Sequence, residues 1–292
     1  MLVAPLVRLL EPRPGDVILD GTVGLGGHAA VLLAQLGATG RYIGLDVDEE
    51  MVEAARERLS VVAGPRIELV AANFAEFPAV LKRLSQEQVN HMLLDLGVNT
   101  AQLDDPSRGF SIDHDGPLDM RFDRRKTRKA IDLVNAMSER ELADLFYEFG
   151  QEGASRKIAK RICQIRHASR IRSTHALARA VESVFESGGV VRRGKTHPAT
   201  RVFQALRVAV NEELSNLRLF LESVVEHLRP GGKLAVISFH SLEDGIVKRF
   251  LREAKEAGTM QEVTRRPIVA EPQERRENPR SRSAKMRVAR RL

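Results

Sequence analysis

The sequence predicts an α/β protein with a doubly wound, Rossmann-like parallel sheet and an inserted helical subdomain. Short apolar runs alternate with amphipathic helical stretches in the two outer parts of the chain, a pattern typical of such sheets. A glycine-rich turn, residues 21–27, joins the first apolar run to the first helical stretch. The middle of the chain has helical periodicity instead. We therefore expect a ligand-binding domain of residues 1–105 and 206–292, and an inserted loop and helical substrate-binding subdomain of residues 106–205.

Each of the four strands predicted before the insert leads to a polar residue. The strands are residues 17–19, 41–46, 67–70 and 91–95, and the polar residues are Asp20, Asp46, Asn73 and Asp95. The carboxyl ends of parallel strands lie at one edge of the sheet, where open α/β proteins bind their ligands. These four side chains should therefore line one crevice.

The glycine-rich turn is the first candidate ligand-binding element. Its glycines and the histidine that follows them are Gly24, Gly26, Gly27 and His28. Glycines let the backbone approach a ligand closely, and the start of the next helix offers unpaired N–H groups. Residues 24–29 match the dinucleotide fingerprint G-x-G-x-x-G/A, which alone is a weak signal. The turn therefore indicates a ligand without identifying it.

Asp20 distinguishes two classes of ligand. A buried carboxylate would repel the diphosphate of a dinucleotide, and it would attract the ammonium and sulfonium groups of S-adenosylmethionine. In the alternative interpretation, Asp20 only accepts hydrogen bonds from N–H groups of the turn. We favour S-adenosylmethionine as the cofactor, and a dinucleotide-dependent dehydrogenase is the first rival.

Two further strand ends suit an adenosine. Asp46 lies about 20 residues beyond the glycine turn, where a carboxylate accepts hydrogen bonds from both ribose hydroxyls. Asn73 and Phe74 follow the third strand, and they offer an amide to the edge of adenine and a ring to its face. In the alternative, Phe74 is an ordinary core residue.

The composition excludes several classes of protein. The 292 residues suggest two domains, and a hydrophobic content of 43% is ample for a core. No apolar run is long enough to span a membrane, and the first ten residues have neither the basic leader nor the cleavage site of a signal peptide. The single cysteine, Cys163, excludes an intrachain disulfide and a thiolate metal cluster. We therefore expect a reducing, cytoplasmic compartment.

The net charge of +7 indicates a polyanionic partner such as a nucleic acid. Basic residues cluster in three stretches, namely 121–129, 156–172 and 265–291. In the last stretch, the residues expected to meet phosphate groups are Arg280, Arg282 and Lys285. The alternative is that these charges belong to solvated helix faces and a solvated tail.

Capping patterns predict where several helices begin. The predicted starts are Ser138, with Glu141 in a capping box, Thr174, before a helix of residues 176–185, and Ser241. Between the last two, the pattern predicts one long helix over residues 199–228. A last strand is expected over residues 284–288.

Two further patterns match the spelling of known binding motifs, but we expect no phosphate or metal site at either. Residues 189–196 match the spelling of a phosphate loop, but no strand precedes them and Pro198 follows at once. We interpret residues 188–189 and 194–198 as a flexible link. His240 and Asp244 have the i, i+4 spacing of a metal pair, but the sequence offers no third ligand, so we expect no metal.

Seven motifs, in order, resemble one family. They are Asp20-Gly-Thr-Val-Gly-Leu-Gly-Gly-His28, Asp95-Leu-Gly-Val98, Gly116-Pro-Leu-Asp-Met-Arg121, His197-Pro-Ala-Thr200, Phe203-Gln-Ala-Leu-Arg207, Val236-Ile-Ser-Phe-His-Ser-Leu-Glu-Asp244 and Asn278-Pro-Arg-Ser-Arg-Ser283. Together they resemble the bacterial ribosomal RNA small-subunit methyltransferase H family over nearly the whole chain. The resemblance implies a class I methyltransferase fold. It also implies S-adenosylmethionine-dependent methylation of the exocyclic N4 of a cytidine in 16S rRNA, near the decoding site of the small ribosomal subunit.

The resemblance also assigns cofactor residues. Gly26, Gly27 and His28 match the residues that hold the methionine end, Asp46 matches the ribose acid and Phe74 the neighbour of adenine. Asp95 and Gln102 complete the family pattern. The chain departs from the family at Ala101, Phe149, Gln151 and Gly245, and it lacks the usual opening His-x-Pro-Val-Leu. These departures concern contacts with the substrate and leave the cofactor residues in place.

The expected chemistry is direct transfer of a methyl group to the cytosine amine. The amine is a poor nucleophile because its lone pair is delocalised into the ring, so acceptors that bind its N–H groups would assist. Asp95 and Asn99 are the candidate acceptors, and His240 is a candidate proton shuttle. No covalent cysteine is expected, because the target is a nitrogen. The second rival is a non-catalytic RNA-binding assembly factor, and the oligomeric state, including a homodimer, stays open.

Overall fold

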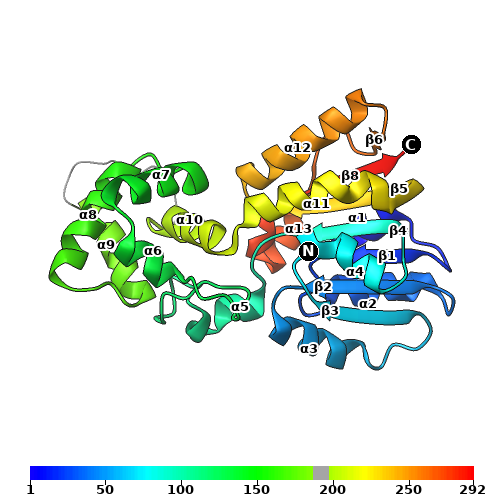
Figure 1. Ribbon diagram of the computed structural model, residues 1–292, viewed down its shortest axis with the longest axis horizontal. Coiled ribbons are helices and arrows are strands. Elements are labelled where there is room, and N and C mark those ends of the chain that lie inside the picture. Colours follow the sequence, from blue (N-terminus) through cyan, green and yellow to red (C-terminus); the bar gives the residue numbers. More distant parts are fainter. Residues whose placement is uncertain (187–196) are drawn as a thin grey trace. The chain divides into compact units, whose positions relative to one another are not determined.

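The computed structural model describes residues 1–186 and 197–292, which divide into two compact units (Figure 1). The first unit comprises residues 1–97 and 214–292, and the second comprises residues 98–213. The insert predicted at residues 106–205 lies inside the second unit, which extends further at both ends. The predicted flexible link lies outside the described residues except for His197 and Pro198.

The first unit is built on a single sheet that confirms the predicted doubly wound class. Its strands are β1 (Val17–Asp20), β2 (Arg41–Asp46), β3 (Arg66–Ala71), β4 (Val89–Asp95), β5 (Leu228–Ser238), β6 (Met260–Glu262), β7 (Ile268–Val269) and β8 (Lys285–Arg291). Their order is β3-β2-β1-β4-β5-β8-β6, and β7 also pairs with β8. Strands β1 to β5 are parallel, whereas β8 is antiparallel to β5. The strand order reverses between β1 and β4, which is where such sheets bind ligands.

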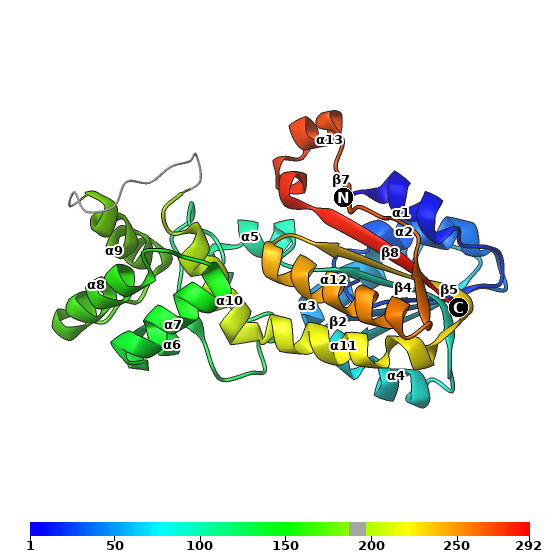
Figure 2. The same cartoon turned by 90° about the horizontal axis from the view of Figure 1, so that it is seen from above.

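Helices cover both faces of this sheet (Figure 2). They are α1 (Val3–Leu10), α2 (Gly27–Leu36), α3 (Glu49–Leu59), α4 (Phe77–Arg83), α11 (Glu213–His227), α12 (Ser241–Glu256) and α13 (Pro272–Glu277), with 3₁₀ turns at Phe74–Glu76 and Pro279–Ser283. Successive strand residues point to opposite faces. Ile18 accordingly joins the core cluster that includes residues of α1 and α2, and Leu19 joins the cluster that includes residues of α4 and α11. Because both faces are buried here, the stretches 17–19 of β1 and 92–94 of β4 are continuously apolar rather than alternating.

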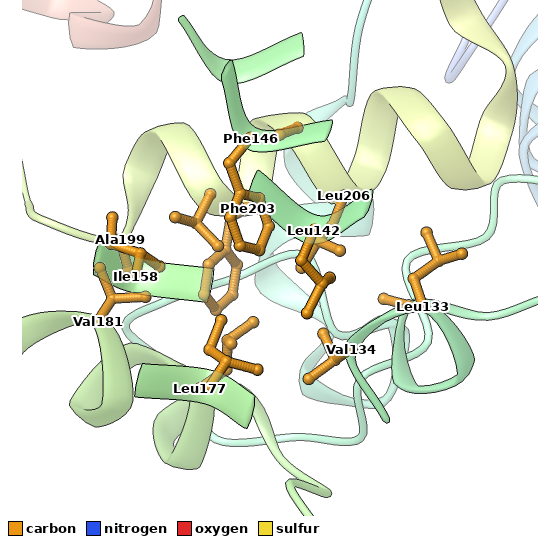
Figure 3. Packing of buried hydrophobic residues seen from close by; sticks show 14 of the residues in the cluster. Leu133, Val134, Leu142, Phe146, Ile158, Leu177, Val181, Ala199, Phe203 and Leu206 are labelled. Carbon is orange, nitrogen blue, oxygen red and sulfur yellow. The ribbon is translucent and has the colours of Figure 1, made fainter. Parts of the chain in front are cut away.

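The second unit is helical, as predicted for the insert. Its helices are α5 (Thr100–Asp104), α6 (Ala130–Ala136), α7 (Glu139–Gly150), α8 (Ser155–Ala168), α9 (Thr174–Glu186) and α10 (Thr200–Asn211), with a 3₁₀ turn at Pro106–Arg108. Phe146, Phe203 and Leu177 point toward one another from α7, α10 and α9 in one apolar cluster (Figure 3). This unit therefore has a core of its own.

Of two helix starts predicted in the insert, one is confirmed and one is wrong. The capping box of Ser138 and Glu141 is confirmed, since each side chain accepts the other residue's backbone N–H. The predicted cap at Thr174 is wrong, because the Ser173 hydroxyl accepts the N–H of Ala176 and α9 already begins at Thr174. Thr174 instead accepts the N–H of Gly116 and so holds the long loop before α6.

Two further helix predictions are wrong in detail. The long helix expected over residues 199–228 is interrupted at Glu212, which has a left-handed backbone conformation (φ 55°) that ends α10. The helix after β5 is capped by His240 and not by Ser241, because the His240 side chain accepts the N–H of Glu243. A histidine at this position is a less common cap than serine, so the sequence pattern favoured the wrong residue.

Among residues 1–186 and 197–292, no helix combines the length and the apolar character needed to cross a membrane.

Candidate functional site

The glycine-rich turn after β1 is bonded to the strands on both sides of it. Gly21 donates its N–H to the carbonyl of Leu93 in β4, and Val23 donates to that of Leu45 in β2. The Thr22 hydroxyl accepts the backbone N–H of Asp95 at 2.7 Å. The turn is therefore held in one position at the carboxyl ends of β1, β2 and β4.

There is no room for a side chain at Gly21. A Cβ at Gly21 would lie 2.5 Å from Cδ2 of Leu94 and 2.8 Å from Cβ of Phe74, which is closer than carbon atoms approach. Gly24 and Gly26 have positive φ angles of 50° and 74°, a conformation that glycine adopts without strain. Gly27 begins α2, so its N–H belongs to the unpaired first turn of the helix.

Asp20 is buried and accepts hydrogen bonds from two residues, Tyr42 and Thr22. Its Oδ2 accepts the Tyr42 hydroxyl at 2.6 Å, and its Oδ1 accepts the backbone N–H of Thr22 at 3.0 Å. Burial raises the pKa of the Asp20 carboxyl, and these hydrogen bonds oppose that shift. The N–H contact is the one foreseen in the alternative interpretation of Asp20. A direct contact with a ligand stays a prediction.

Asp46 lies at the end of β2, where it binds both the turn and the following loop. One carboxylate oxygen accepts the N–H of Gly24 at 2.9 Å, and the other accepts the N–H of Asp48 at 3.0 Å. A carboxylate oxygen has two lone pairs, so each can accept one more donor, such as a ribose hydroxyl. Burial raises the pKa of Asp46 to about 7. The position therefore suits the predicted contact with a diol.

Asp95 and His28 meet beside the turn. The Asp95 Oδ2 lies 3.5 Å from His28 Nδ1, and the Asp95 Oδ1 is buried without a hydrogen-bond partner among the described residues. His28 Nε2 lies 2.8 Å from the Met1 carbonyl and must carry a proton to bond to it. Burial raises the pKa of Asp95 to about 7 and lowers the pKa of His28. An unpaired buried acid oxygen at a strand end favours a ligand that brings a positive charge or an N–H donor.

The two candidate residues that follow β3 are Asn73 and Phe74. The Asn73 side chain accepts the N–H of Ala75, which starts the short 3₁₀ turn. Phe74 is partly buried, and its ring meets that of Phe220 edge to face, with centroids 5.9 Å apart. Phe74 thus packs against the core, as in the alternative interpretation, and keeps some exposed surface. Its contact with adenine stays a prediction.

Asn99 and Gln102 belong to the second unit, where they form the capping box of α5. The Asn99 side chain accepts the N–H of Gln102 at 2.9 Å, and the Gln102 side chain accepts that of Asn99 at 3.1 Å. Gln102 is buried. Their predicted contacts with the cofactor and the target amine stay predictions.

His240 is held at the start of α12 by Glu243. Its Nδ1 accepts the Glu243 N–H at 3.4 Å, and its Nε2 lies 3.1 Å from the Glu243 carboxylate, although the Nε2 hydrogen is poorly aligned for a hydrogen bond. Asp244 binds Arg287 through two contacts of 2.7 and 3.3 Å. The His240–Asp244 spacing is thus explained by a cap and an ion pair.

Thr22 and Tyr42 are site residues that the sequence did not single out. Thr22 is the only hydroxyl in the turn, and a polar residue that follows an acid at a strand end is a usable signal. Tyr42 lies inside an apolar strand, and a buried tyrosine hydroxyl needs a partner, but the sequence does not say which one.

The whole chain matches known proteins. The model of a family described as the MraW methylase family matches residues 1–292. A protein from Sorangium cellulosum named ribosomal RNA small subunit methyltransferase H is 46% identical over 287 residues, which are 98% of this chain and 88% of that protein. A protein of the same name from Acaryochloris marina is 48% identical over 275 residues, which are 94% of this chain and 87% of that protein.

Replacing Tyr42 by phenylalanine tests the support of Asp20. The Asp20 carboxylate then lacks its shortest hydrogen bond, so we expect the free energy of unfolding in urea at pH 7 to fall by roughly 1–3 kcal/mol. Tyr147→Phe is the matched control, because Tyr147 is 66% exposed. Equal unfolding curves for the two variants would show that Tyr42 does not hold Asp20.

Proposed function

Because the chain belongs to the MraW methylase family, we propose that it methylates the exocyclic N4 of a cytidine in 16S rRNA, near the decoding site of the small ribosomal subunit. The family match over the full chain carries this proposal. The relatives named for the small ribosomal subunit support rRNA as the substrate. The choice of N4, of the decoding site and of a cytoplasmic location follows the resemblance of the seven motifs.

The cofactor of this family is S-adenosylmethionine, and the site fits it. The residues that would hold the cofactor are Asp20, Gly24, Gly26, Gly27 and His28 at the methionine end, Asp46 at the ribose, Phe74 at adenine, and Asp95 and Gln102. Two observations support the fit. Asp46 keeps acceptor capacity for two hydroxyls, and the unpaired buried oxygen of Asp95 suits a cationic ligand.

When bound, the cofactor supplies an electrophilic methyl group on a sulfonium. The protein then has to make the cytosine amine a better nucleophile. An acceptor that binds an amine N–H favours the pyramidal form of the nitrogen and stabilises its developing positive charge. Asp95 is the candidate for this role because its Oδ1 is unpaired and its raised pKa favours uptake of a proton near neutral pH.

His240 is less suited than Asp95 to accept the proton. Its Nδ1 accepts the N–H of Glu243, so in the neutral ring the proton resides on Nε2. The Nδ1 lone pair is therefore engaged in the helix cap. Asn99 remains the second candidate to bind the amine. Cys163 lies in α8 of the second unit, and attack on a nitrogen needs no thiolate.

Methylation of ribosomal subunits tests the enzyme against the rival of a non-catalytic assembly factor. Small subunits from cells that lack this protein, incubated with labelled S-adenosylmethionine, should yield N4-methylcytidine when the nucleosides are analysed by mass spectrometry. Asp95→Asn should lower kcat by about 10²-fold or more, as expected for a lost proton acceptor. Absence of label in the RNA at saturating wild-type protein would remove the enzyme from consideration, and label in another nucleoside would correct the target.

The affinity for S-adenosylmethionine should depend on pH. The pKa values of Asp46 and Asp95 are raised to about 7, so both groups become protonated as the pH falls from 8 to 6. The neutral acids bind a cation and two hydroxyls less well, and each group limits the loss to about tenfold per pH unit. Calorimetry should therefore show weaker binding at pH 6 than at pH 8.

Asp46→Asn and S-adenosylhomocysteine are the controls for this pH dependence. The variant should bind the cofactor with a smaller change between pH 6 and 8, because one of the two titrating groups is gone. S-adenosylhomocysteine has no sulfonium charge and should lose less affinity at low pH. If the wild-type affinity for S-adenosylmethionine is constant over this range, the acids do not hold the cofactor in their charged forms.

A further inference from the structure

His28 and Asp95 are neighbours in the first unit, at the carboxyl ends of the parallel strands. Asp95 is the last residue of β4, and His28 is the second residue of α2, directly after the glycine-rich turn. The Asp95 Oδ2 lies 3.5 Å from His28 Nδ1, and the two side chains are 21% and 10% exposed. Both groups are therefore largely shielded from water, so each strongly influences where the other holds a proton.

The second nitrogen of His28 determines the tautomer of the ring. Nε2 lies 2.8 Å from the Met1 carbonyl, which can only accept, so Nε2 carries a proton. This carbonyl is held in place, because the next residue, Leu2, is buried and donates its N–H to the Glu274 carboxylate at 2.8 Å. In a neutral imidazole, one nitrogen is a donor and the other an acceptor. Nδ1 therefore presents a lone pair to Asp95.

This tautomer favours a proton on the Asp95 oxygen that faces the ring. An ionised Asp95 would direct a lone pair of Oδ2 at the lone pair of Nδ1, and the two would repel each other. A proton on Oδ2, donated to Nδ1, removes this repulsion. Hydrogen bonds between reacting groups are often as long as 3.5 Å before the substrate binds. Oδ1 then remains the acceptor oxygen of Asp95, and it has no hydrogen-bond partner among the described residues.

We propose that Asp95 and His28 act as a pair in which a proton from the target amine is passed through Asp95 to His28. The inference rests on the proposed function, in which an amine nitrogen is methylated. Methyl transfer forms a carbon–nitrogen bond, breaks the carbon–sulfur bond with its electron pair staying on sulfur, and leaves a positive charge on the nitrogen. The nitrogen keeps the electron pair of an N–H bond and gives the proton to Asp95 Oδ1. The proton on Oδ2 moves to Nδ1, so Asp95 stays neutral and His28 becomes an imidazolium.

The surroundings of His28 suit this change of charge. Burial and the amino terminus lower the pKa of His28, so the ring is neutral at pH 7 and able to accept a proton. The Met1 carbonyl, Asp20 and Glu274 raise the same pKa, so they stabilise the imidazolium once it forms. The positive charge of the sulfonium is lost in the transfer, and the imidazolium replaces it beside the buried acids.

NMR of protein labelled with ¹⁵N-histidine tests the tautomer without cofactor or RNA. At pH 7, His28 should carry its proton on Nε2, and Nδ1 should be unprotonated. His227 is the internal control, because its Nδ1 lies 2.9 Å from the Ser223 carbonyl and must donate to it. His227 should therefore show the opposite tautomer. The two signals are assigned by their loss in His28→Gln and in His227→Gln.

His28→Gln separates the uptake of a proton from a structural role. The glutamine amide can donate to the Met1 carbonyl as Nε2 does, but it has no nitrogen that accepts a proton. At pH 7 and saturating cofactor, kcat on small subunits should therefore fall by about 10²-fold. The KM for subunits and the calorimetric affinity for S-adenosylmethionine should change by less than about tenfold, because the bond to Met1 is kept. His227→Gln should keep the wild-type kcat.

Asp95→Asn combined with His28→Gln tests whether the two residues act as a unit. Asparagine at position 95 breaks the path to His28, so the double variant should lose little more kcat than Asp95→Asn alone. The proposal is overturned if the losses of the single variants multiply, if His28→Gln keeps the wild-type kcat, or if Nδ1 of His28 is protonated at pH 7. The proposed function fails separately, if wild-type protein forms no N4-methylcytidine in small subunits. The tautomer is measured on the protein alone and does not depend on that result.

Discussion

The attachment of the glycine-rich turn to its neighbouring strands is the constraint on which the site depends. Thr22 accepts the N–H of Asp95, and Asp46 accepts the N–H of Gly24, so the turn is bonded to the ends of both β4 and β2. A turn fixed on two sides holds the start of α2, and with it His28, at a constant distance from the acids. The absence of a side chain at Gly21 lets it lie against Leu94 and Phe74.

The turn brings acidic groups together at a place where burial opposes their charges. Burial is the largest effect on the pKa of Asp20, Asp46 and Asp95 and raises all three, whereas the positive groups that lower the pKa, His28 for Asp20 and the amino terminus for Asp95, have smaller effects. Without its ligand, such a site has too little positive charge nearby to keep the buried acids ionised. A cationic cofactor supplies that charge. The same pattern would disfavour the diphosphate of a dinucleotide, so the electrostatics agree with membership of a methylase family.

Much of this arrangement could be predicted from the sequence because it depends on local patterns. The strand ends at Asp20, Asp46 and Asp95 follow from apolar runs that stop at an acid, and their shared edge follows from the parallel topology. The hydrogen-bond partners of these acids could not be predicted, because the Tyr42 hydroxyl reaches Asp20 from the neighbouring strand β2, and the spacing of residues in the sequence does not indicate this contact. The predicted helix ends were wrong for a similar reason, because they too depend on contacts between residues distant in the sequence. Glu212 adopts a left-handed conformation although glutamate has no strong preference for it, and its side chain is bound by Lys126 from a distant loop.

The Thr22 hydroxyl holds the turn in the position in which we expect it to bind S-adenosylmethionine, and calorimetry of Thr22→Val with this cofactor measures its contribution. Valine has nearly the same shape but leaves the Asp95 N–H without its acceptor, a loss of about 1–3 kcal/mol. We expect the variant to bind the cofactor roughly tenfold or more weakly than wild type, and Thr22→Ser, which keeps the hydroxyl, to bind almost normally. Wild-type affinity in the valine variant would show that cofactor binding does not depend on this hydrogen bond.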